Sequence, residues 1–188
     1  TIWICWVALN QESPNIGLSL GRLDQLLYPF YKADVDGKDD DYIINYNKKA
    51  VELLCFFWLK IGDHVPTMLD AGEKLFGGTG SNQAVTIGGV DKDENDAVNE
   101  LTYIILKAAS LLKLRDPNLA ARYHPEKNPA EYIRKLSESN IVTGAIPAIY
   151  NDKSVIAALK AKGDKNHAWD YGIVGCVEPV CAGRTCGH

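Results

Sequence analysis

Apolar residues recur at two different spacings along this 188-residue chain, and the two spacings alternate. Apolar positions three and four residues apart are typical of amphipathic helices, whereas short unbroken apolar runs are typical of buried strands. Runs of the second kind lie near Ile2, Val85, Leu119, Ala148 and Ile173. Because segments of helical spacing separate them, the pattern predicts an α/β fold with about five mainly parallel strands alternating with helices.

The helical spacing is clearest between residues 41 and 60, where apolar residues from Ile44 to Leu59 recur on one face. Pro129 and Gly163 mark further helix ends, since proline is tolerated in a first turn and glycine often follows a last turn. The predicted helices cover residues 19–28, 41–60, 96–113, 129–137 and 152–162, with another turn or two between 63 and 75.

Composition and charge exclude several classes of protein. Hydrophobic residues make up 46% of the chain and charged residues 23%, the ordinary balance of a globular protein. The formal net charge of −4 offers no basic footprint for nucleic acid, and no apolar run is long enough to span a membrane. No repeat or linker marks a boundary, so we expect residues 1–188 to form a single α/β domain.

The chain contains five cysteines, at Cys5, Cys55, Cys176, Cys181 and Cys186. Their odd number and scattered spacing suit a reducing, cytoplasmic interior better than a disulfide framework. Those near the C-terminus contain no C-x-x-C pair, so no metal site is predicted, although His188 lies close to them in sequence.

The clearest candidate for chemistry is the stretch Gly175-Cys176-Val177-Glu178-Pro179, which follows a short apolar run. In extended backbone, residues two apart project to the same side, so Cys176 and Glu178 are expected to share one face. Pro179 favours extended geometry in the residue before it, and ligands of α/β proteins tend to bind at strand ends. The alternative is a buried small residue followed by a turn.

A second candidate is the small-residue loop from Gly77 to Asn82, which precedes the apolar run near Val85. As a phosphate-binding loop it is weak, because no lysine follows in the required position and a strand rather than a helix comes next. Glycines there favour close approach of a ligand or of another backbone segment. We therefore expect Cys176 and Glu178 to point into one cavity beside this loop.

Six stretches of the chain together carry a resemblance to a known protein family. They are Gly21–Gln25, Tyr28–Tyr31, Thr86–Gly89, Asp96–Tyr103, Ile146–Asp152 and the cysteine stretch. Their residues and their order along the chain resemble those of the glycyl radical enzymes of the pyruvate formate-lyase superfamily. The resemblance implies a ten-stranded barrel of two five-stranded halves, of which these residues supply about the first half, as part of a larger catalytic domain. The loop that bears the radical glycine has no counterpart in these residues, so this stretch alone is expected to be inactive.

The resemblance also implies roles for the cysteine stretch. Cys176 would become a thiyl radical that abstracts hydrogen from a small substrate, and Glu178 would act as the acid/base residue. No cofactor would be bound, because the glycyl radical is installed on another region by a radical SAM activating enzyme. A homodimer is the expected form of the full enzyme.

Departures from the family pattern narrow the chemistry. Val177 follows Cys176 where pyruvate formate-lyase has a second cysteine, so the chain resembles the lyase, dehydratase and decarboxylase branch. Ile16 and Gly17 replace the His-Ser of diol dehydratases, and Asn82 replaces a pocket aromatic. The substrate-binding positions implied by the resemblance are Ile16, Gly17, Gly80, Ser81 and Asn82.

A different class of function stays open from the residues alone: a non-catalytic fold fragment or paralogue that serves as a structural or partner-binding piece. The histidines do not favour either class. His64, His124 and His167 lie in polar or loop stretches without a partner cysteine or carboxylate at motif spacing, and we expect them not to be catalytic.

Overall fold

The computed structural model describes residues 1–12, 17–62, 83–181 and 183–184. Within them, four strands form a parallel sheet in the order β1-β2-β3-β4, and two more form an antiparallel hairpin. The strands of the sheet are β1 (Ser19–Arg22), β2 (Ala84–Gly88), β3 (Asn118–Tyr123) and β4 (Ala148–Asn151). The hairpin is made of β5 (Tyr171–Val174) and β6 (Glu178–Cys181).

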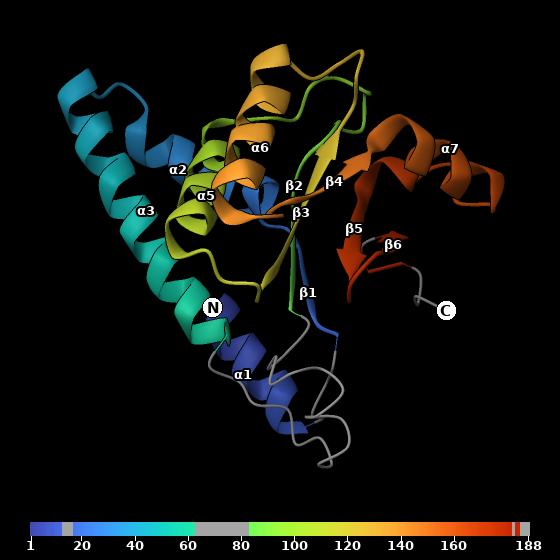
Figure 1. The fold of residues 1–188 in the computed structure, drawn as a ribbon, viewed down its shortest axis with the longest axis horizontal. Coiled ribbons are helices and arrows are strands. Elements are labelled where there is room, and N and C mark those ends of the chain that lie inside the picture. The colour runs from blue at the N-terminus through green and yellow to red at the C-terminus, as the bar shows by residue number, and fades with distance from the viewer. Residues whose placement is uncertain (13–16, 63–82, 182, 185–188) are drawn as a thin grey trace.

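The helices lie on both sides of this sheet (Figure 1). They are α1 (Ile2–Glu12), α2 (Leu23–Val35), α3 (Asp40–Gly62), α5 (Glu100–Leu112), α6 (Ala130–Thr143) and α7 (Asp152–Ala161), with a 3₁₀ turn η1 (Ala168–Asp170) before β5. Helices α2, α3, α5 and α6 cover one face of the sheet, whereas α7 and the hairpin lie on the other side (Figure 1). The α/β fold class expected from the sequence is confirmed, with four parallel strands in the sheet because the strand near Ile173 lies in the antiparallel hairpin.

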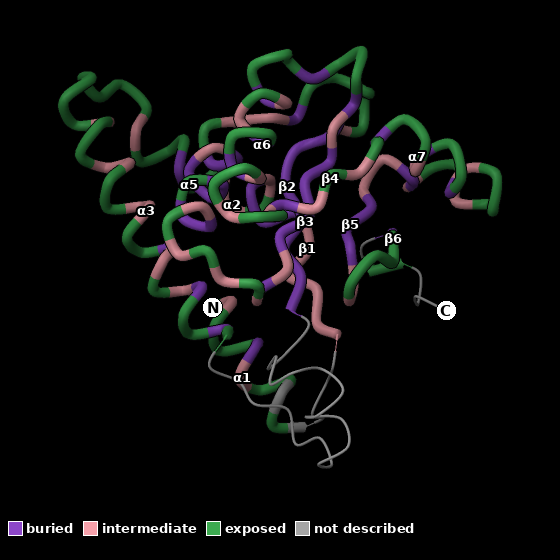
Figure 2. Tube along the Cα trace, in the orientation of Figure 1, coloured by how far each residue is buried: buried purple, intermediate pink, exposed green. Residues whose placement is uncertain are grey.

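Alternation along the strands separates two hydrophobic clusters, because successive residues of a strand point to opposite faces. Val85 and Ile87 of β2 pack with the helices, together with Leu119 of β3. Ala120 packs instead with Tyr171 and Ile173 of the hairpin. Buried residues accordingly run along β2 and β3 in Figure 2. The sheet therefore has a helix-covered face and a face that carries the hairpin.

The N-terminal part of the sequence prediction is wrong. Residues Ile2 to Leu9, expected to form a core strand, lie in helix α1, and the predicted helix from Ser19 instead begins at Leu23, after strand β1. An unbroken apolar run has no period that separates a buried strand from a buried helix. Strand β1 is only four residues long and half-buried at most of its positions, so it leaves no strong signal in the sequence.

The later elements agree with the sequence prediction in kind, with shifts at their ends. Helix α5 begins after Asn99 because this residue caps it: Asn99 Oδ1 accepts from the Thr102 amide at 3.2 Å, and Thr102 Oγ1 accepts from the Asn99 amide at 3.1 Å. Helix α6 runs on to Thr143, beyond the predicted end near 137. No helix in the described ranges is long and apolar enough to cross a membrane.

Candidate active site

The cysteine stretch forms the tip of the β5–β6 hairpin. Val174 pairs with Glu178 and Ile173 with Pro179, which leaves Gly175, Cys176 and Val177 as the connecting loop. The side chains of Cys176 and Glu178 are both exposed in this chain. The i, i+2 expectation assumes extended backbone from Cys176 to Glu178, whereas residues 175–177 form a turn in which the backbone reverses direction.

Gly175 makes this reversal possible. Its φ of +62° lies in the left-handed region, which residues with a Cβ rarely adopt. A Cβ at this position would also lie 2.9 Å from Glu178 Oε2. The same carboxylate oxygen accepts a hydrogen bond from the Val177 amide at 2.9 Å. The Glu178 carboxylate is thus folded back over the loop that carries Cys176, and the turn rather than the i, i+2 spacing brings it there.

Strand β5 of the hairpin crosses the face of the sheet that α2, α3, α5 and α6 do not cover, and it runs antiparallel to β1. A Cβ on Gly172 would lie 3.5 Å from both Gly21 Cα and Thr86 Oγ1, and one on Gly17 would lie 3.8 Å from Gly175 Cα. Thr86 Oγ1 also accepts from the Ile173 amide at 2.9 Å. Small residues on both segments allow this close approach. The tip therefore lies near the amino ends of the parallel strands, and the hairpin begins near their carboxyl ends.

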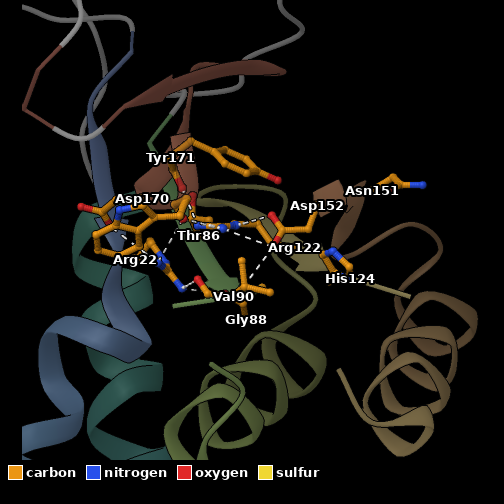
Figure 3. A network of polar contacts seen from close by, with 12 residues as sticks. Arg22, Thr86, Gly88, Val90, Arg122, His124, Asn151, Asp152, Asp170 and Tyr171 are labelled. Carbon is orange, nitrogen blue, oxygen red and sulfur yellow. Dashed lines mark hydrogen bonds and ion pairs between the residues drawn. The ribbon is translucent and has the colours of Figure 1, made fainter. Parts of the chain in front are cut away.

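Two buried arginines hold the start of β5. Arg122 donates from Nη1 to the Tyr171 carbonyl at 2.9 Å and from Nη2 to the Trp169 carbonyl at 2.7 Å. Arg22 donates from Nη2 to the carbonyls of Gly88 at 3.1 Å and Val90 at 2.9 Å. Figure 3 shows both guanidinium groups between the strand ends and the start of the hairpin. Arg22 Nη1 also donates to the Trp169 carbonyl at 3.4 Å. The two arginines therefore join the segment that leads into β5 to the carboxyl ends of β1, β2 and β3.

Two buried carboxylates complete this network. Asp152 accepts from Arg122 Nε at 2.7 Å and from the Val90 amide at 3.0 Å. Asp24 accepts from the Gly88 amide at 2.8 Å and from Thr102 Oγ1 at 2.7 Å. Burial raises the pKa of the Asp24 carboxyl above its ordinary value. Burial and, to a lesser degree, the nearby charge of Arg122 lower the pKa of Arg22 to about 10, so Arg22 stays charged at neutral pH.

The ion pair between Arg122 and Asp152 is fully buried, and breaking it is expected to cost stability. Asp152→Asn in the full-length protein removes the charge but keeps the shape, and leaves Arg122 buried without its counter-ion. The free energy of unfolding, measured by urea denaturation, is expected to fall by about 3–5 kcal/mol. The matched control is Glu138→Gln at the exposed pair with Arg134, which is expected to change it by less than about 1 kcal/mol. Equal effects of the two variants would contradict this account.

Gly89 is expected to be intolerant of a side chain. Its φ is +81°, and a Cβ there would lie 2.5 Å from Arg122 Nε and 2.8 Å from Asp152 Oδ2, both in the buried network. Gly89→Ala should therefore lower the free energy of unfolding by about 1–2 kcal/mol of backbone strain and about 1–3 kcal/mol of overpacking. Gly144→Ala is the control, because Gly144 has a φ of +86° but no atom within 4 Å of its added Cβ. Urea denaturation of both variants should show the larger loss for Gly89→Ala.

The other predicted site residues are only partly within the described ranges. Gly17 lies against Gly175 of the hairpin loop, but its role in substrate binding stays a prediction. Ile16, Gly80, Ser81 and Asn82 lie outside the described residues, as does the loop of 77–82 expected beside the cavity. Glu178 lines a groove of about 700 Å³ between α7 and β6, together with Ser154 and Lys162, and Cys176 is not among its lining residues. A cavity shared by Cys176 and Glu178 also stays a prediction.

The histidines within the described ranges make local contacts. The His124 amide donates to Asn128 Oδ1 at 2.7 Å, and His124 Nδ1 accepts from the Glu126 amide at 3.3 Å. His167 immediately precedes η1, and His64 and His188 lie outside the described ranges. Among the residues that the structure describes, no group of three or more His, Cys, Asp or Glu side chains could hold a metal ion.

Sequence reasoning gave no role to the residues that position the hairpin. Arg22, Asp24 and Asp152 stood in the family-like stretches, whereas Arg122 and Asn118 did not. A signal for Arg122 was present, because it follows the apolar run Leu119-Ala120-Ala121, where a charged residue must be paired if buried. The long-range contacts themselves leave no trace in the sequence.

The whole chain, residues 1–188, matches the family model described as pyruvate formate lyase-like. The chain belongs to this family. It is 34% identical over 170 residues to the isethionate sulfite-lyase of Bilophila wadsworthia, a match that covers 89% of this chain and 20% of that protein. It is also 34% identical over 184 residues to the (2S)-3-sulfopropanediol dehydratase of Klebsiella oxytoca, covering 94% of this chain and 21% of that protein.

Two solved structures agree with the fold. A glycyl radical enzyme from Archaeoglobus fulgidus superposes with a TM-score of 0.82 at 35% identity, covering 97% of this chain and 23% of that one. The glycerol-bound B12-independent glycerol dehydratase of Clostridium butyricum gives a TM-score of 0.76 at 34% identity, covering 88% of this chain and 20% of that one. The chain therefore spans about a fifth of the length of these relatives and corresponds to part of the glycyl radical enzyme barrel. The predicted resemblance is confirmed.

Proposed function

We propose that this chain supplies the cysteine side of the active site of a glycyl radical lyase. The observation that carries the proposal is the hairpin itself: an exposed thiol at its tip, with the Glu178 carboxylate folded back over the same loop. Arg22 and Arg122 bind the turn that precedes β5, and Thr86 binds the Ile173 amide within β5. Membership of a family whose relatives are lyases and dehydratases supports the same conclusion.

In the proposed first step, Cys176 passes its thiol hydrogen atom to a glycyl radical. The S–H bond breaks and a C–H bond forms on the glycine, which leaves the unpaired electron on Cys176 Sγ. Cys176 then takes a hydrogen atom from a substrate C–H bond and is a thiol again. A neutral thiyl loses little solvation in a dry pocket, but it requires close contact with the substrate carbon.

In the proposed second step, Glu178 acts on the substrate radical. Its carboxylate takes a proton from the substrate as the neighbouring bond breaks and the leaving group departs with the bonding electrons. The product radical then takes a hydrogen atom from the Cys176 thiol, which restores the thiyl. Cys176 Sγ finally takes back the α-hydrogen atom of the glycine, so that the unpaired electron lies on the glycine again. The position of the Glu178 carboxylate over the cysteine loop supports this division of roles.

The radical itself belongs to a part of the polypeptide other than these residues. The glycyl radical supplies the unpaired electron. The exposed hairpin tip leaves the Cys176 thiol accessible to the segment that bears this radical. We propose that a radical SAM activating enzyme installs it, that no other cofactor is bound, and that the full-length protein is a cytoplasmic homodimer. Residues 1–188 would form a single α/β domain within the larger catalytic domain.

The proposed substrate is a small molecule that undergoes C–O, C–N, C–S or C–C cleavage. Val177 beside Cys176 argues against acyl transfer to a second thiol. The names of relatives supply four probes: isethionate, (2S)-3-sulfopropanediol, trans-4-hydroxy-L-proline and glycerol. Residues Ile16, Gly17, Gly80, Ser81 and Asn82 are the proposed contacts that select among such compounds.

The test is anaerobic activation of the full-length protein, followed by EPR spectroscopy and incubation with these four probes. The proposal predicts a glycyl radical signal and conversion of at least one probe, with no conversion before activation. Absence of a radical after treatment with an activase that works on a related enzyme would favour the second candidate, a non-catalytic paralogue. That candidate remains a proposal because the chain spans about a fifth of its relatives.

A further inference from the structure

The tip of the hairpin is attached to the sheet by two side chains that the proposed chemistry does not use. Asn118 Nδ2 donates to the Gly175 carbonyl at 3.3 Å and to the Cys176 carbonyl at 3.2 Å. Tyr150 Oη donates to the same Cys176 carbonyl at 3.0 Å. Asn118 opens β3 and Tyr150 lies in β4, so two neighbouring strands converge on one carbonyl oxygen.

This carbonyl is a sensitive place to hold the loop. The carbonyl carbon of Cys176 is bonded to the Cα from which the thiol side chain extends. Two hydrogen bonds to the carbonyl oxygen therefore restrict rotation about the Cα–C bond and limit where Sγ can lie. Ladder pairing of the hairpin ends at Val174 and Glu178, and the loop adds the bond from the Val177 amide to Glu178. Fixing the tip therefore depends on contacts from outside the hairpin as well as on its own backbone.

The donors suit this task chemically. Partial burial and, to a lesser degree, the neighbouring charge of Glu178 raise the pKa of the Tyr150 hydroxyl above its ordinary value. Tyr150 is therefore protonated at neutral pH and serves as a hydrogen-bond donor. An amide nitrogen carries two hydrogens, which lets Asn118 reach both adjacent carbonyls. The two carbonyls accept three hydrogen bonds in all.

We propose that Asn118 and Tyr150 are positioning residues that place Cys176 Sγ for hydrogen-atom transfer. This inference rests on the proposed function, since it assumes that Cys176 exchanges a hydrogen atom with the glycyl radical. Transfer rates fall steeply when reacting atoms are misplaced, and an error of about 1 Å can cost about 100-fold. Loss of both donors keeps the thiol group but lets the loop tip that carries it shift.

The test needs no knowledge of the substrate. In D2O the Cys176 thiol carries deuterium, and repeated transfer to the glycyl radical and back replaces the α-hydrogen of that glycine. The hyperfine splitting from this hydrogen then disappears from the EPR spectrum. The rate constant of this loss is a property of each radical-bearing molecule, so it does not change when a variant merely contains less folded or less activated protein.

The variants are Asn118→Leu and Tyr150→Phe in the full-length protein, singly and together, because both keep bulk while removing the donor. The control is Tyr103→Phe, a half-buried tyrosine of α5 on the helix-covered side of the sheet. We expect the double variant to lose the splitting about 10–100-fold more slowly than the parent, with intermediate rates for the single variants and the parental rate for Tyr103→Phe.

Other outcomes would overturn either the positioning role or the proposed function. A double variant that exchanges at the parental rate, or a Tyr103→Phe control that slows as much, would overturn the positioning role and leave the proposed function intact. Exchange in Cys176→Ser at the parental rate would overturn the proposed function itself, and the positioning role with it.

Discussion

Cys176→Ser in the full-length protein is expected to abolish turnover while the glycyl radical still forms. A serine O–H bond is much stronger than a thiol S–H bond, so its hydrogen atom is not transferred to the glycyl radical at a useful rate. The substitution should leave the loop in place, because the hydrogen bonds from Asn118 and Tyr150 go to the backbone carbonyl of residue 176 and not to its side chain. Product assays with the parent's substrate and spin quantification by EPR check both parts.

The control for this prediction is Cys55→Ser on α3, a half-buried cysteine in the helix-covered cluster. It should keep turnover per radical at the parental value. Turnover by Cys176→Ser at a substantial fraction of the parental rate would contradict both the role of the thiol and the proposed reaction. Loss of the radical signal in this variant would contradict the claim that the thiol acts only after activation.

Glu178→Gln is expected to slow elimination about 10²–10⁴-fold, the usual contribution of a positioned acid or base. The amide keeps the shape of the side chain and an oxygen that can accept from the Val177 amide, so the loop geometry is preserved. It cannot take a proton from the substrate. Hydrogen abstraction should therefore persist, and deuterium should still exchange into the substrate while product formation falls.

The control here is Glu52→Gln, which changes an exposed carboxylate of α3 and should have no effect on product formation. Measuring substrate exchange and product in the same reaction separates the two roles. Full turnover by Glu178→Gln would remove the carboxylate from the mechanism. Loss of substrate exchange together with product would mean that Glu178 is needed for hydrogen abstraction or for substrate binding.

Local sequence patterns predicted the parts of the fold that depend on local physics. Helices α3 and α5 follow from their apolar spacing, although the cap at Asn99 that sets the start of α5 was not predicted. The strands near Val85 and Leu119 follow from short apolar runs with neighbouring turn residues. Cys176 and Glu178 were singled out from their own stretch, and the family resemblance, which joined several short stretches that are each weak alone, gave them expected roles.

The remaining features depend on contacts between distant residues. Residues 2–9 were predicted as a strand but lie in helix α1, and residues 19–22 were predicted as helix but form strand β1. A short apolar run has no period that decides between the two. Gly175 allows the sharp bend before Cys176, but the reversal into a hairpin also depends on the docking of β5 against β1, a long-range contact. The network of Arg22, Arg122 and Asp152 joins residues up to 148 positions apart, and no local pattern encodes it.

The most direct test of the central claim is the loss of the glycyl α-hydrogen splitting in D2O, compared between the parent, Cys176→Ser and Glu178→Gln. If Cys176 is the residue that exchanges a hydrogen atom with the glycyl radical, the splitting disappears in the parent. It disappears at a similar rate in Glu178→Gln, which retains the thiol and the loop contacts. It persists in Cys176→Ser. Loss of the splitting in Cys176→Ser as fast as in the parent would contradict the account.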